Sequence, residues 1–511
     1  MNFSMLLEMA ADGVGDRVAI GSNDSGVTYT TLLDQARRAA TYFKSHAAEH
    51  VALIDLNTPA VPAVLYGAAL ADKPFVPLNY RLKDEQLQAI LKRIVPAVAI
   101  VDESVPARVG DIEGIELITT AEFLRRLDDV DADEAAAVFP ESGEEDIAVL
   151  LFTSGTTGEP KAAVLRHQNL TSYVLSTVEF MGAGEEECAL MSVPPYHIAS
   201  ISAFLTGIYN GRRVVQLPSF EEKEWVRLAR DEAVTFAMVV PTMLKRILDV
   251  MEGEGIALPA LRQLSYGGGM MPVPVIERAL KLMPHVDFVN AYGLTETSST
   301  VALLGPDDHR EAIASTDPKV RARLGSVGRP LPTLELDIRD DEGNPVPVGS
   351  SGEIWVRGDQ VSGEYLGKRA LRPDGWFPTN DGGHFDDDGF LYVEGRLDDV
   401  IVRGGENLSP GEIEDVILTH PAVQDVAVVG VPDTQWGETV AAVIVEYPEH
   451  HVSDDELREF VAKELRSTKT PTIIERRLEL PYHDTGKVLR RVLRAELAEH
   501  AEKAGHARPE A

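Results

Sequence analysis

A set of small hydroxyl-bearing and glycine residues follows an apolar run near residue 150. The run from Ile147 to Phe152 ends in Thr153, and the string TSGTTGEPK then reaches Lys161. An apolar run of this length predicts a buried strand that feeds a loop of small residues. Glycines let the backbone approach a ligand closely, while free N–H groups, hydroxyls and a lysine offer an anion many donors. The pattern therefore favours binding of phosphate groups, with a solvated glycine- and threonine-rich turn as the alternative.

The loop is not a Walker motif. That motif requires G-x-x-x-x-G-K-[ST], whereas here Gly155 is followed by Gly158, and Glu159 and Pro160 precede Lys161. A phosphate site in this loop would therefore not be of the Walker type.

Three later stretches also carry residues that could do chemistry. They are NAYGLTETSS at 290–299, WFPTNDGGHFDDDGFLYVEGRLDDVIVRGGENLSPGEIE at 376–414, and HDTGKVLRR at 483–491. Each fragment alone is compatible with ordinary structure. Together with the loop, and in this order, they resemble the motifs of the adenylate-forming superfamily, which contains acyl-CoA and aryl-CoA synthetases, adenylation domains of peptide synthetases, and beetle luciferases. The resemblance covers residues 150 to 491.

The resemblance implies an ATP site. The clamp on the β- and γ-phosphates would comprise Thr153, Ser154, Gly155, Thr156, Thr157, Gly158 and Lys161. Tyr292 resembles the ring that stacks on adenine. Its expected neighbours in the nucleotide site are Gly268, Gly269, Asn290, Ala291 and Gly293.

The resemblance also assigns charged groups to the reaction. Thr295 would touch phosphate and Glu296 would hold Mg²⁺, which usually takes one or two carboxylates plus phosphate oxygens. Asp381 would accept the ribose hydroxyls, with Arg396 as the second ribose contact. Lys487 matches the lysine that bridges the substrate carboxylate and the α-phosphate.

A mobile lysine has a physical reason in this chemistry. A carboxylate that attacks ATP is one anion approaching another, so the barrier is electrostatic and positional. An ammonium about 4 Å from a developing charge offers roughly 4 kcal/mol at an effective dielectric near 20. Thiolate attack on the acyl-adenylate needs the same space, so the resemblance implies rotation of a small domain about Asp398. After that rotation, Gly404 and Gly405 would line the pantetheine tunnel.

Two stretches depart from the family pattern. Thr379, Asn380 and Asp381 stand where the family commonly has Thr-Gly-Asp. Residues 481–487 read PYHDTGK, where the family has a sequence closer to Pro-Arg-Thr-x-Thr-Gly-Lys. Neither departure removes a charged group, but Asn380 could alter the geometry of the ribose contact.

The acid to be activated is only partly indicated. His197, in the string PPYH, matches a histidine beside the acyl site of acyl-CoA synthetases; a packed core histidine is the alternative. No aspartate there could hold an amino group, and Ala291 replaces the arginine of malonate-specific members, so we expect an apolar monocarboxylate: fatty, aryl or alicyclic. The expected acyl pocket comprises Tyr196, His197, Tyr266, Gly267, Gly268, Gly269, Met270 and Met271.

The primary functional hypothesis is an ATP- and Mg²⁺-dependent acyl-CoA synthetase, with CoA as co-substrate. The alternatives are a stand-alone ligase that loads the pantetheine arm of a carrier protein, and a non-catalytic nucleotide sensor. Retention of both Glu296 and Lys487 argues against the sensor. Nothing implies the oxygen chemistry of a luciferase.

The elements that must position these residues are alternating strands and helices. Strands are predicted at 51–56, 97–101, 147–152, 214–217 and 236–240, with an amphipathic helix after Asp84 and Glu85. This alternation implies layered α/β sheets in an N-terminal domain of residues 1–396. Turn signals and two-residue alternation indicate an antiparallel, barrel-like β subdomain at about 325–395.

A second, smaller α+β domain is expected over residues 397–511. Its predicted strands are 426–431 and 440–445, its last helix is 490–499, and a polar tail is expected from residue 500 onward. This domain would be the mobile one that carries Lys487.

Composition limits the partners. The chain has 511 residues, with 48 Lys and Arg against 82 Asp and Glu, for a formal charge of −34. Such a surface disfavours nucleic acid and anionic membranes. The single cysteine, Cys188, excludes an internal disulfide and suits a reducing compartment. With no signal peptide or apolar run of membrane-spanning length, we expect a cytoplasmic monomer or homodimer.

Overall fold

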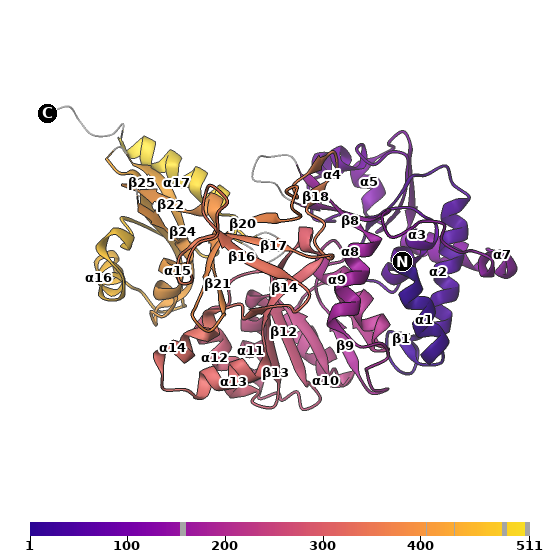
Figure 1. Cartoon of the computed structure of the whole chain (residues 1–511), viewed down its shortest axis with the longest axis horizontal. Helices are drawn as coiled ribbons and strands as arrows, with labels where there is room; N and C mark the ends of the chain where they lie inside the picture. Colours follow the sequence, from indigo (N-terminus) through magenta and orange to yellow (C-terminus); the bar gives the residue numbers. More distant parts are fainter. Residues whose placement is uncertain (154–159, 405, 434, 483–487, 506–511) are drawn as a thin grey trace.

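The computed structural model describes residues 1–511 except 154–159, 405, 434, 483–487 and 506–511. Figure 1 shows the N-terminal helices at one end of the molecule, antiparallel strands in the middle, and the C-terminal α+β unit at the other end. Within the described residues, no helix has the length and apolar character that crossing a bilayer requires.

The first sheet carries the strand before the predicted phosphate loop. Strands β3, β4, β5 and β6 are parallel neighbours, and β7 pairs antiparallel with β8. In the described residues its order is β19 (Lys368–Arg369), β18 (Glu364–Tyr365), β8 (Lys161–Arg166), β7 (Ile147–Thr153), β4 (Phe75–Pro77), β3 (His50–Ile54), β5 (Ala97–Val101) and β6 (Ile115–Thr119).

The second sheet is mostly parallel through its centre. Strands β10, β9, β11, β12 and β13 run in one direction, so their carboxyl ends meet at one edge, where ligands of such sheets bind. Its order across the described residues is β15 (Arg329–Pro330), β14 (Ser299–Leu304), β13 (Asp287–Leu294), β12 (Gln263–Gly267), β11 (Phe236–Val239), β9 (Cys188–Met191), β10 (Arg213–Gln216), β1 (Val18–Ile20) and β2 (Val27–Thr28).

Helices cover these two sheets and supply most of the core. Helix α3 is buried along its whole length, whereas α10 buries only the face that carries Trp225, Val226 and Ala229. The helices in this part of the chain are α1 (Ser4–Val14), α2 (Tyr29–Lys44), α3 (Ala60–Leu70), α4 (Asp84–Leu91), α5 (Val105–Val109), α6 (Thr120–Asp128), α7 (Ala132–Ala136), α8 (His167–Thr177), α9 (Ile198–Tyr209), α10 (Glu222–Asp231), α11 (Pro241–Glu254), α12 (Val273–Leu282), α13 (Pro306–Ala314) and α14 (Pro318–Ala322), with 3₁₀ turns η1 (Thr295–Thr297) and η2 (Arg323–Gly325).

The antiparallel subdomain follows. Its sheet consists of β16 (Glu335–Arg339), β17 (Gly352–Arg357), β20 (Phe377–Phe385) and β21 (Leu391–Arg396). The last pair places Asp381 opposite Arg396 in the β20–β21 register. Two residues of the predicted ribose site are thereby brought together by strand pairing alone.

The C-terminal unit is an α+β layer built on one long hairpin. Strand β24 pairs with β25 along ten residue pairs, from Val423↔Glu446 to Asp433↔Gly437. The described elements are η3 (Leu397–Asp399), β22 (Ile401–Arg403), β23 (Glu406–Leu408), α15 (Pro410–Leu418), β24 (Val423–Asp433), β25 (Gly437–Glu446), α16 (Asp454–Glu464), η4 (Ser467–Lys469), β26 (Ile473–Arg476) and α17 (Arg490–Gly505).

The architecture confirms the predicted fold class, a layered α/β part followed by antiparallel strands and a smaller α+β part. The last helix is longer than expected, because α17 continues to Gly505 where a polar tail was predicted from His500 onward. The extension is rich in alanine, glutamate and lysine, which favour helix even without apolar periodicity.

Candidate functional site at the carboxyl ends of the strands

The predicted phosphate loop is flanked by a closely paired strand end and strand start. Thr153, the last residue of β7, lies opposite Lys161, the first of β8, and its Oγ1 donates to the Lys161 carbonyl at 3.3 Å. Ser154, Gly155, Thr156, Thr157 and Gly158 lie outside the described residues. Lys161 is exposed, with its Nζ 5.8 Å from the ring centroid of Tyr365.

Three predicted nucleotide contacts form one hydrogen-bonded cluster. The Tyr292 hydroxyl, at the end of β13, donates to Oδ2 of Asp381 at 2.7 Å. Arg396 donates from Nη1 to Oδ1 of the same carboxylate at 2.9 Å. Asp381 is only 6% exposed, and each of its carboxylate oxygens accepts a hydrogen bond from a residue on another strand.

The electrostatics of this cluster keep its charges fixed. Burial, together with the Asp381 charge, raises the pKa of Tyr292 well above its usual range, so the phenol remains a donor. Burial alone would lower the pKa of Arg396, but the Asp381 carboxylate more than offsets this and the net pKa is raised. The cluster therefore presents a buried anion bonded to a neutral phenol and a guanidinium.

Asn380, a departure from the family motif, links this cluster to the predicted hinge. Its backbone has φ = +62°, a left-handed conformation that asparagine tolerates and glycine adopts without strain. Its Nδ2 donates to Oδ2 of Asp398 at 2.8 Å, and its backbone N–H donates to Oε1 of Glu353 at 2.9 Å. A glycine here could not make the side-chain bond.

Glu296 lies in η1, just after β13. Its carboxylate accepts a hydrogen bond at Oε1 from the Tyr365 hydroxyl at 2.6 Å. Its backbone carbonyl accepts from the N–H groups of Ser362 at 2.9 Å and Gly363 at 3.2 Å. Thr295, which begins η1, is half-buried beside it.

No cluster of three or more histidine, cysteine or acidic side chains suited to a metal occurs among the described residues. One carboxylate with a spare oxygen fits a magnesium ion held chiefly by phosphate oxygens and water. Glu296 has that arrangement, because the hydrogen bond from Tyr365 occupies only Oε1.

Several residues predicted for the nucleotide and acyl sites have a role in the pairing of the strands. An added Cβ on Gly267 would lie 2.2 Å from the Ala291 carbonyl oxygen, and one on Gly293 would lie 1.8 Å from that of Ser299. These two glycines permit close strand pairing. Asn290 is 7% exposed and donates to the Ser326 carbonyl at 2.9 Å, so its side chain holds the strand end in place. Gly268 and Gly269 lie just beyond the end of β12.

The residues predicted for the acyl pocket fall into separate environments. Tyr196 packs edge-on against Tyr80 at 5.6 Å and against His197 at 4.7 Å between ring centroids, where α9 begins. The Tyr266 ring, in contrast, is fully buried in the core on β12, and its hydroxyl bonds Nε2 of His309 at 2.8 Å. Only the backbone of Tyr266 therefore remains available to an acyl pocket.

Two predicted pocket methionines also differ in surroundings. Met271 is buried in the core cluster of β11, β12 and the adjacent helices. Met270 is 44% exposed, and its methyl group faces Gly411 of α15, where an added Cβ would approach to 2.6 Å. Met270 thus lies where the C-terminal unit contacts the large sheets.

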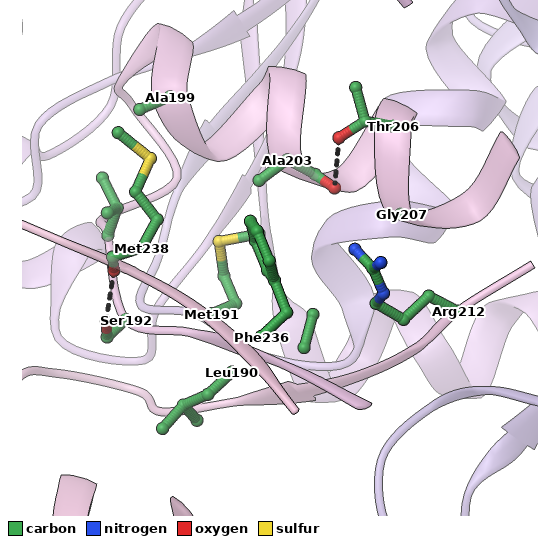
Figure 2. Close-up of a pocket in the computed structure, with 12 residues that line it drawn as sticks. Leu190, Met191, Ser192, Ala199, Ala203, Thr206, Gly207, Arg212, Phe236 and Met238 are labelled. Carbon is green, nitrogen blue, oxygen red and sulfur yellow. Dashed lines mark hydrogen bonds between the residues drawn. The ribbon is translucent and has the colours of Figure 1, made fainter. Parts of the chain in front are cut away.

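Sequence reasoning missed a narrow, mainly apolar cavity between α9 and the second sheet (Figure 2). Its helix side is made of the small residues Ala199, Ala203, Thr206 and Gly207, and Met238 and Phe236 line it from β11. Small residues four apart on α9 were the available signal, but such a stripe also occurs wherever helices pack closely. Ala199, the first residue of α9 that lines the cavity, lies two positions after His197.

The two ends of this cavity differ chemically. At the carboxyl end of the strands, the Ser192 hydroxyl donates to the Met238 carbonyl at 3.2 Å (Figure 2). At the opposite end, the Arg212 guanidinium stacks on Phe236 at 4.9 Å and pairs with Glu187 at 2.8 Å. The positive charge of Arg212 at this end of the cavity is thus already neutralised by Glu187.

The described glycine of the predicted pantetheine tunnel, Gly404, lies between strands β22 and β23. Gly404 has φ = +59°, and its N–H donates to the Trp436 carbonyl at 2.7 Å. Asp398 lies in η3, between β21 and this hairpin. Gly405 and Lys487 lie outside the described residues.

Comparison with known proteins gives consistent relatives. The profile of AMP-binding enzymes matches residues 7–366, and that of the AMP-binding enzyme C-terminal domain matches residues 412–487. A 2-succinylbenzoate–CoA ligase of Bacillus licheniformis is 31% identical over 505 residues, which covers 95% of this chain and 98% of the relative.

Solved structures of similar proteins also superpose on nearly the whole chain. An o-succinylbenzoate CoA synthetase of Bacillus subtilis, in complex with its acyl-adenylate intermediate, superposes with a TM-score of 0.82 at 27% identity, covering 96% of this chain and 97% of that one. A fatty acyl CoA synthetase of Mycobacterium tuberculosis superposes with a TM-score of 0.75 at 28% identity, covering 98% and 99%.

Proposed function

The chain belongs to the AMP-binding enzyme family and is an AMP-forming acid–thiol ligase, and we propose that its acid is an apolar monocarboxylate, fatty, aryl or alicyclic. In the first half-reaction a carboxylate oxygen attacks the α-phosphorus of ATP, giving acyl-AMP and pyrophosphate. In the second, the CoA thiolate attacks the acyl carbon and AMP leaves. The observation that carries the proposal is the Tyr292–Asp381–Arg396 cluster beside Glu296 at the strand ends.

The cluster suits ribose recognition. A carboxylate accepts hydrogen bonds strongly from two adjacent hydroxyls, and Asp381 is fixed for that role by partners on two sides. We assign Arg396 to the second ribose contact and Tyr292 to the adenine face. Entry of the ribose must displace or share one of the present bonds to Asp381.

Glu296 is the residue that would hold Mg²⁺, and the bound ion would neutralise charge on the ATP phosphates. Thr295 and the 153–158 loop, with Lys161, would orient the phosphates so that the α-phosphorus faces the acid. Lys487 would stabilise the charge that develops on the carboxylate and α-phosphate during the first step. In the proposed domain division, residues 1–396 form the nucleotide and acyl site, and residues 397–511 turn about Asp398.

We assign the acyl group to the space that starts at His197 and continues into the cavity beneath α9. The cavity is narrow, but Met191 and Met238 at its lining are flexible, unbranched side chains that can make room. Because Arg212 is already paired with Glu187, the far end offers no unmatched cation to a second carboxylate. This supports a monocarboxylate with an apolar body.

The relatives widen the choice of acids to be tested. Their names include 2-succinylbenzoate and fatty acyl substrates, so aromatic and aliphatic acids belong in one panel. We further propose a cytoplasmic monomer or homodimer. The single cysteine, buried and free, is compatible with a reducing compartment.

The test is mass spectrometry of reactions that contain the pure protein, Mg-ATP and pooled carboxylates, with and without CoA. Acyl-AMP without CoA, replaced by acyl-CoA when CoA is added, is the expected result and names the acid. Acyl-AMP that persists despite CoA would favour a carrier-protein acceptor. Absence of AMP, acyl-AMP and pyrophosphate with every acid would overturn the proposal.

A further inference from the structure

The segment of residues 359–366 ties the Glu296 turn to the sheet that carries the phosphate loop. On the turn side, the Gln360 side chain donates from Nε2 to the carbonyls of Thr297 at 3.0 Å and Thr300 at 2.8 Å. The Ser362 and Gly363 N–H groups bind the Glu296 carbonyl. The turn is therefore fixed to this segment through the main-chain carbonyls of Glu296, Thr297 and Thr300.

The same segment is bound to the first sheet on its other side. Glu364 and Arg166 form a two-point ion pair, with Nη2 to Oε1 at 2.9 Å and Nε to Oε2 at 3.1 Å. The Leu366 N–H donates to the Ala162 carbonyl at 2.8 Å, and Tyr365 pairs with Ala163 across β18 and β8. The 359–366 segment is thus a bridge between Glu296 and the strand that begins at Lys161.

Tyr365 is the residue of this bridge that reaches reacting groups. Its hydroxyl donates to Oε1 of Glu296 at 2.6 Å, and the Lys161 Nζ lies 5.8 Å from its ring centroid. A phenol is a hydrogen-bond donor at neutral pH and a carboxylate only accepts, so the proton of this bond belongs to Tyr365. The Tyr365 side chain therefore bonds the Glu296 carboxylate through its hydroxyl and has the Lys161 ammonium near its ring.

A hydrogen bond to one carboxylate oxygen restricts the positions that the other oxygen can take. With Oε1 held, rotation of the Glu296 carboxylate is limited, and no hydrogen bond to Oε2 is found in the part of the chain that the structure describes. A cation with strict octahedral geometry needs its few protein ligands held in place. Outer hydrogen bonds that orient a metal-binding side chain commonly tune metal affinity.

We propose that Tyr365 is a positioning residue, which holds Glu296 through Oε1 so that Oε2 is directed toward the divalent cation accompanying the nucleotide. This inference rests on the proposed function, because it requires a metal–nucleotide complex at Glu296. It adds to that function a residue outside the motifs that predicted the site, at the end of the 359–366 segment.

The test measures metal-dependent nucleotide binding without turnover. Isothermal titration calorimetry with an ATP analogue that has a methylene group in place of the α,β-bridging oxygen gives affinities in EDTA and over a series of Mg²⁺ concentrations. Tyr365→Phe keeps the ring and removes the donor, and we expect it to raise the half-saturating Mg²⁺ concentration by about 10-fold or more, the scale for losing a hydrogen bond that orients a metal-binding side chain. Binding in EDTA should change by less than about twofold, a margin within ordinary mutational scatter.

Two control variants separate positioning from general stability. Glu364→Gln weakens the ion pair with Arg166, and so the bridge, while leaving the Tyr365 hydroxyl in place. Tyr42→Phe removes a phenolic oxygen that accepts from Arg126 at 2.7 Å, remote from the site. Both should keep the wild-type Mg²⁺ dependence, and thermal unfolding should confirm that all the variants fold.

A double variant provides an independent check. In a Glu296→Gln background, Tyr365→Phe should cause no further change, since both act on the same ligand. Wild-type Mg²⁺ dependence in Tyr365→Phe, or equal shifts in Glu364→Gln, would overturn the inference while leaving the proposed function intact. A wild-type protein whose analogue binding ignores Mg²⁺ would instead count against the proposed function itself.

Discussion

The cluster around Asp381, which joins β13 of the second sheet to β20 and β21, and the cavity beneath α9 are constructed in opposite ways. In the cluster, the Asp381 carboxylate is held by residues from two other strands, with 2.7 Å to the Tyr292 hydroxyl and 2.9 Å to Nη1 of Arg396. The cavity is bounded by small side chains of one helix and by flexible side chains of the strands (Figure 2). One region fixes positions, and the other leaves space.

This difference teaches which properties of the protein tolerate change. A buried carboxylate with two partners loses much when any one group is altered, because the remaining polar groups are left unpaired. An apolar lining can exchange one side chain for another at modest cost, provided that volume is kept. We therefore expect substitutions in the cluster to affect every substrate alike and substitutions in the cavity to change which acid is preferred.

The largest expected effect belongs to the polar chemistry and concerns Lys487. Lys487→Ala should reduce acyl-AMP formation by roughly 10²–10³-fold, the scale for losing one group that stabilises the transition state. Transfer from supplied acyl-AMP to CoA should be much less affected, because the role proposed for the lysine is confined to the first step. Pyrophosphate release and acyl-CoA formation, measured separately, give the two rates, and equal losses in both would contradict a lysine that serves only the first step.

Next in size is Asp381→Asn, which keeps the shape of the cluster and removes its charge. Arg396 would lose its ion pair and Tyr292 its charged acceptor, so we expect the KM for ATP to rise by roughly 10- to 100-fold, in line with about 1.5–3 kcal/mol for a hydrogen bond to a charged group. Steady-state kinetics with several acids measures it. A change confined to one acid would show that the cluster is not a general nucleotide site.

A smaller and selective effect is expected in the cavity. Ala203→Val should add two methyl groups to the narrow space between α9 and Phe236, and lower kcat/KM for the longest acids by about 10-fold or more, as one to three kcal/mol of apolar contact is lost. The KM for ATP and activity with the shortest acids should be retained. Equal loss for short and long acids would remove the cavity from the acyl site.

The smallest effect should come from Asn380→Gly. Glycine accepts φ = +62° without strain and keeps the N–H bond to Glu353, so only the bond to Asp398 is lost. We expect a change of about two- to fivefold in the ratio of the two half-reactions, the scale of one partly exposed hydrogen bond. Asn380→Ala serves as control, because it loses the same bond and adds about 1 kcal/mol of backbone strain that thermal unfolding detects. An unchanged ratio would show that the Asn380–Asp398 bond does not link the nucleotide cluster to the hinge.

The contrast between the Asp381 cluster and the cavity also explains which features could be predicted from the sequence. Strands at 97–101 and 147–152 were found almost to the residue, because buried parallel strands are short apolar runs between turn signals. Tyr292 and Arg396, which the motifs placed with Asp381, both contact its carboxylate. Their roles toward ATP stay predictions.

The residues around the proposed acyl pocket could not be predicted from the sequence in the same way. Tyr266 was expected to line the pocket, but alternation along β12 turns its ring into the core toward His309. The cavity depends on Ala203 and Phe236, which are distant in sequence and carry no motif, so only packing brings them together. Tyr365 went unnoticed for a similar reason, since its role depends on one hydrogen bond across 69 positions of sequence.

The lone cysteine has a practical consequence. Cys188 is fully buried on β9, and burial raises the pKa of its thiol to about 11, so at neutral pH it is neither accessible nor ionised. Consumption of CoA can therefore be followed with thiol-reactive dyes with little background from the folded protein. For the same reason, a pair of cysteines introduced on either side of Asp398 would carry fluorophores at those two positions alone, and energy transfer between them would show whether the proposed rotation occurs.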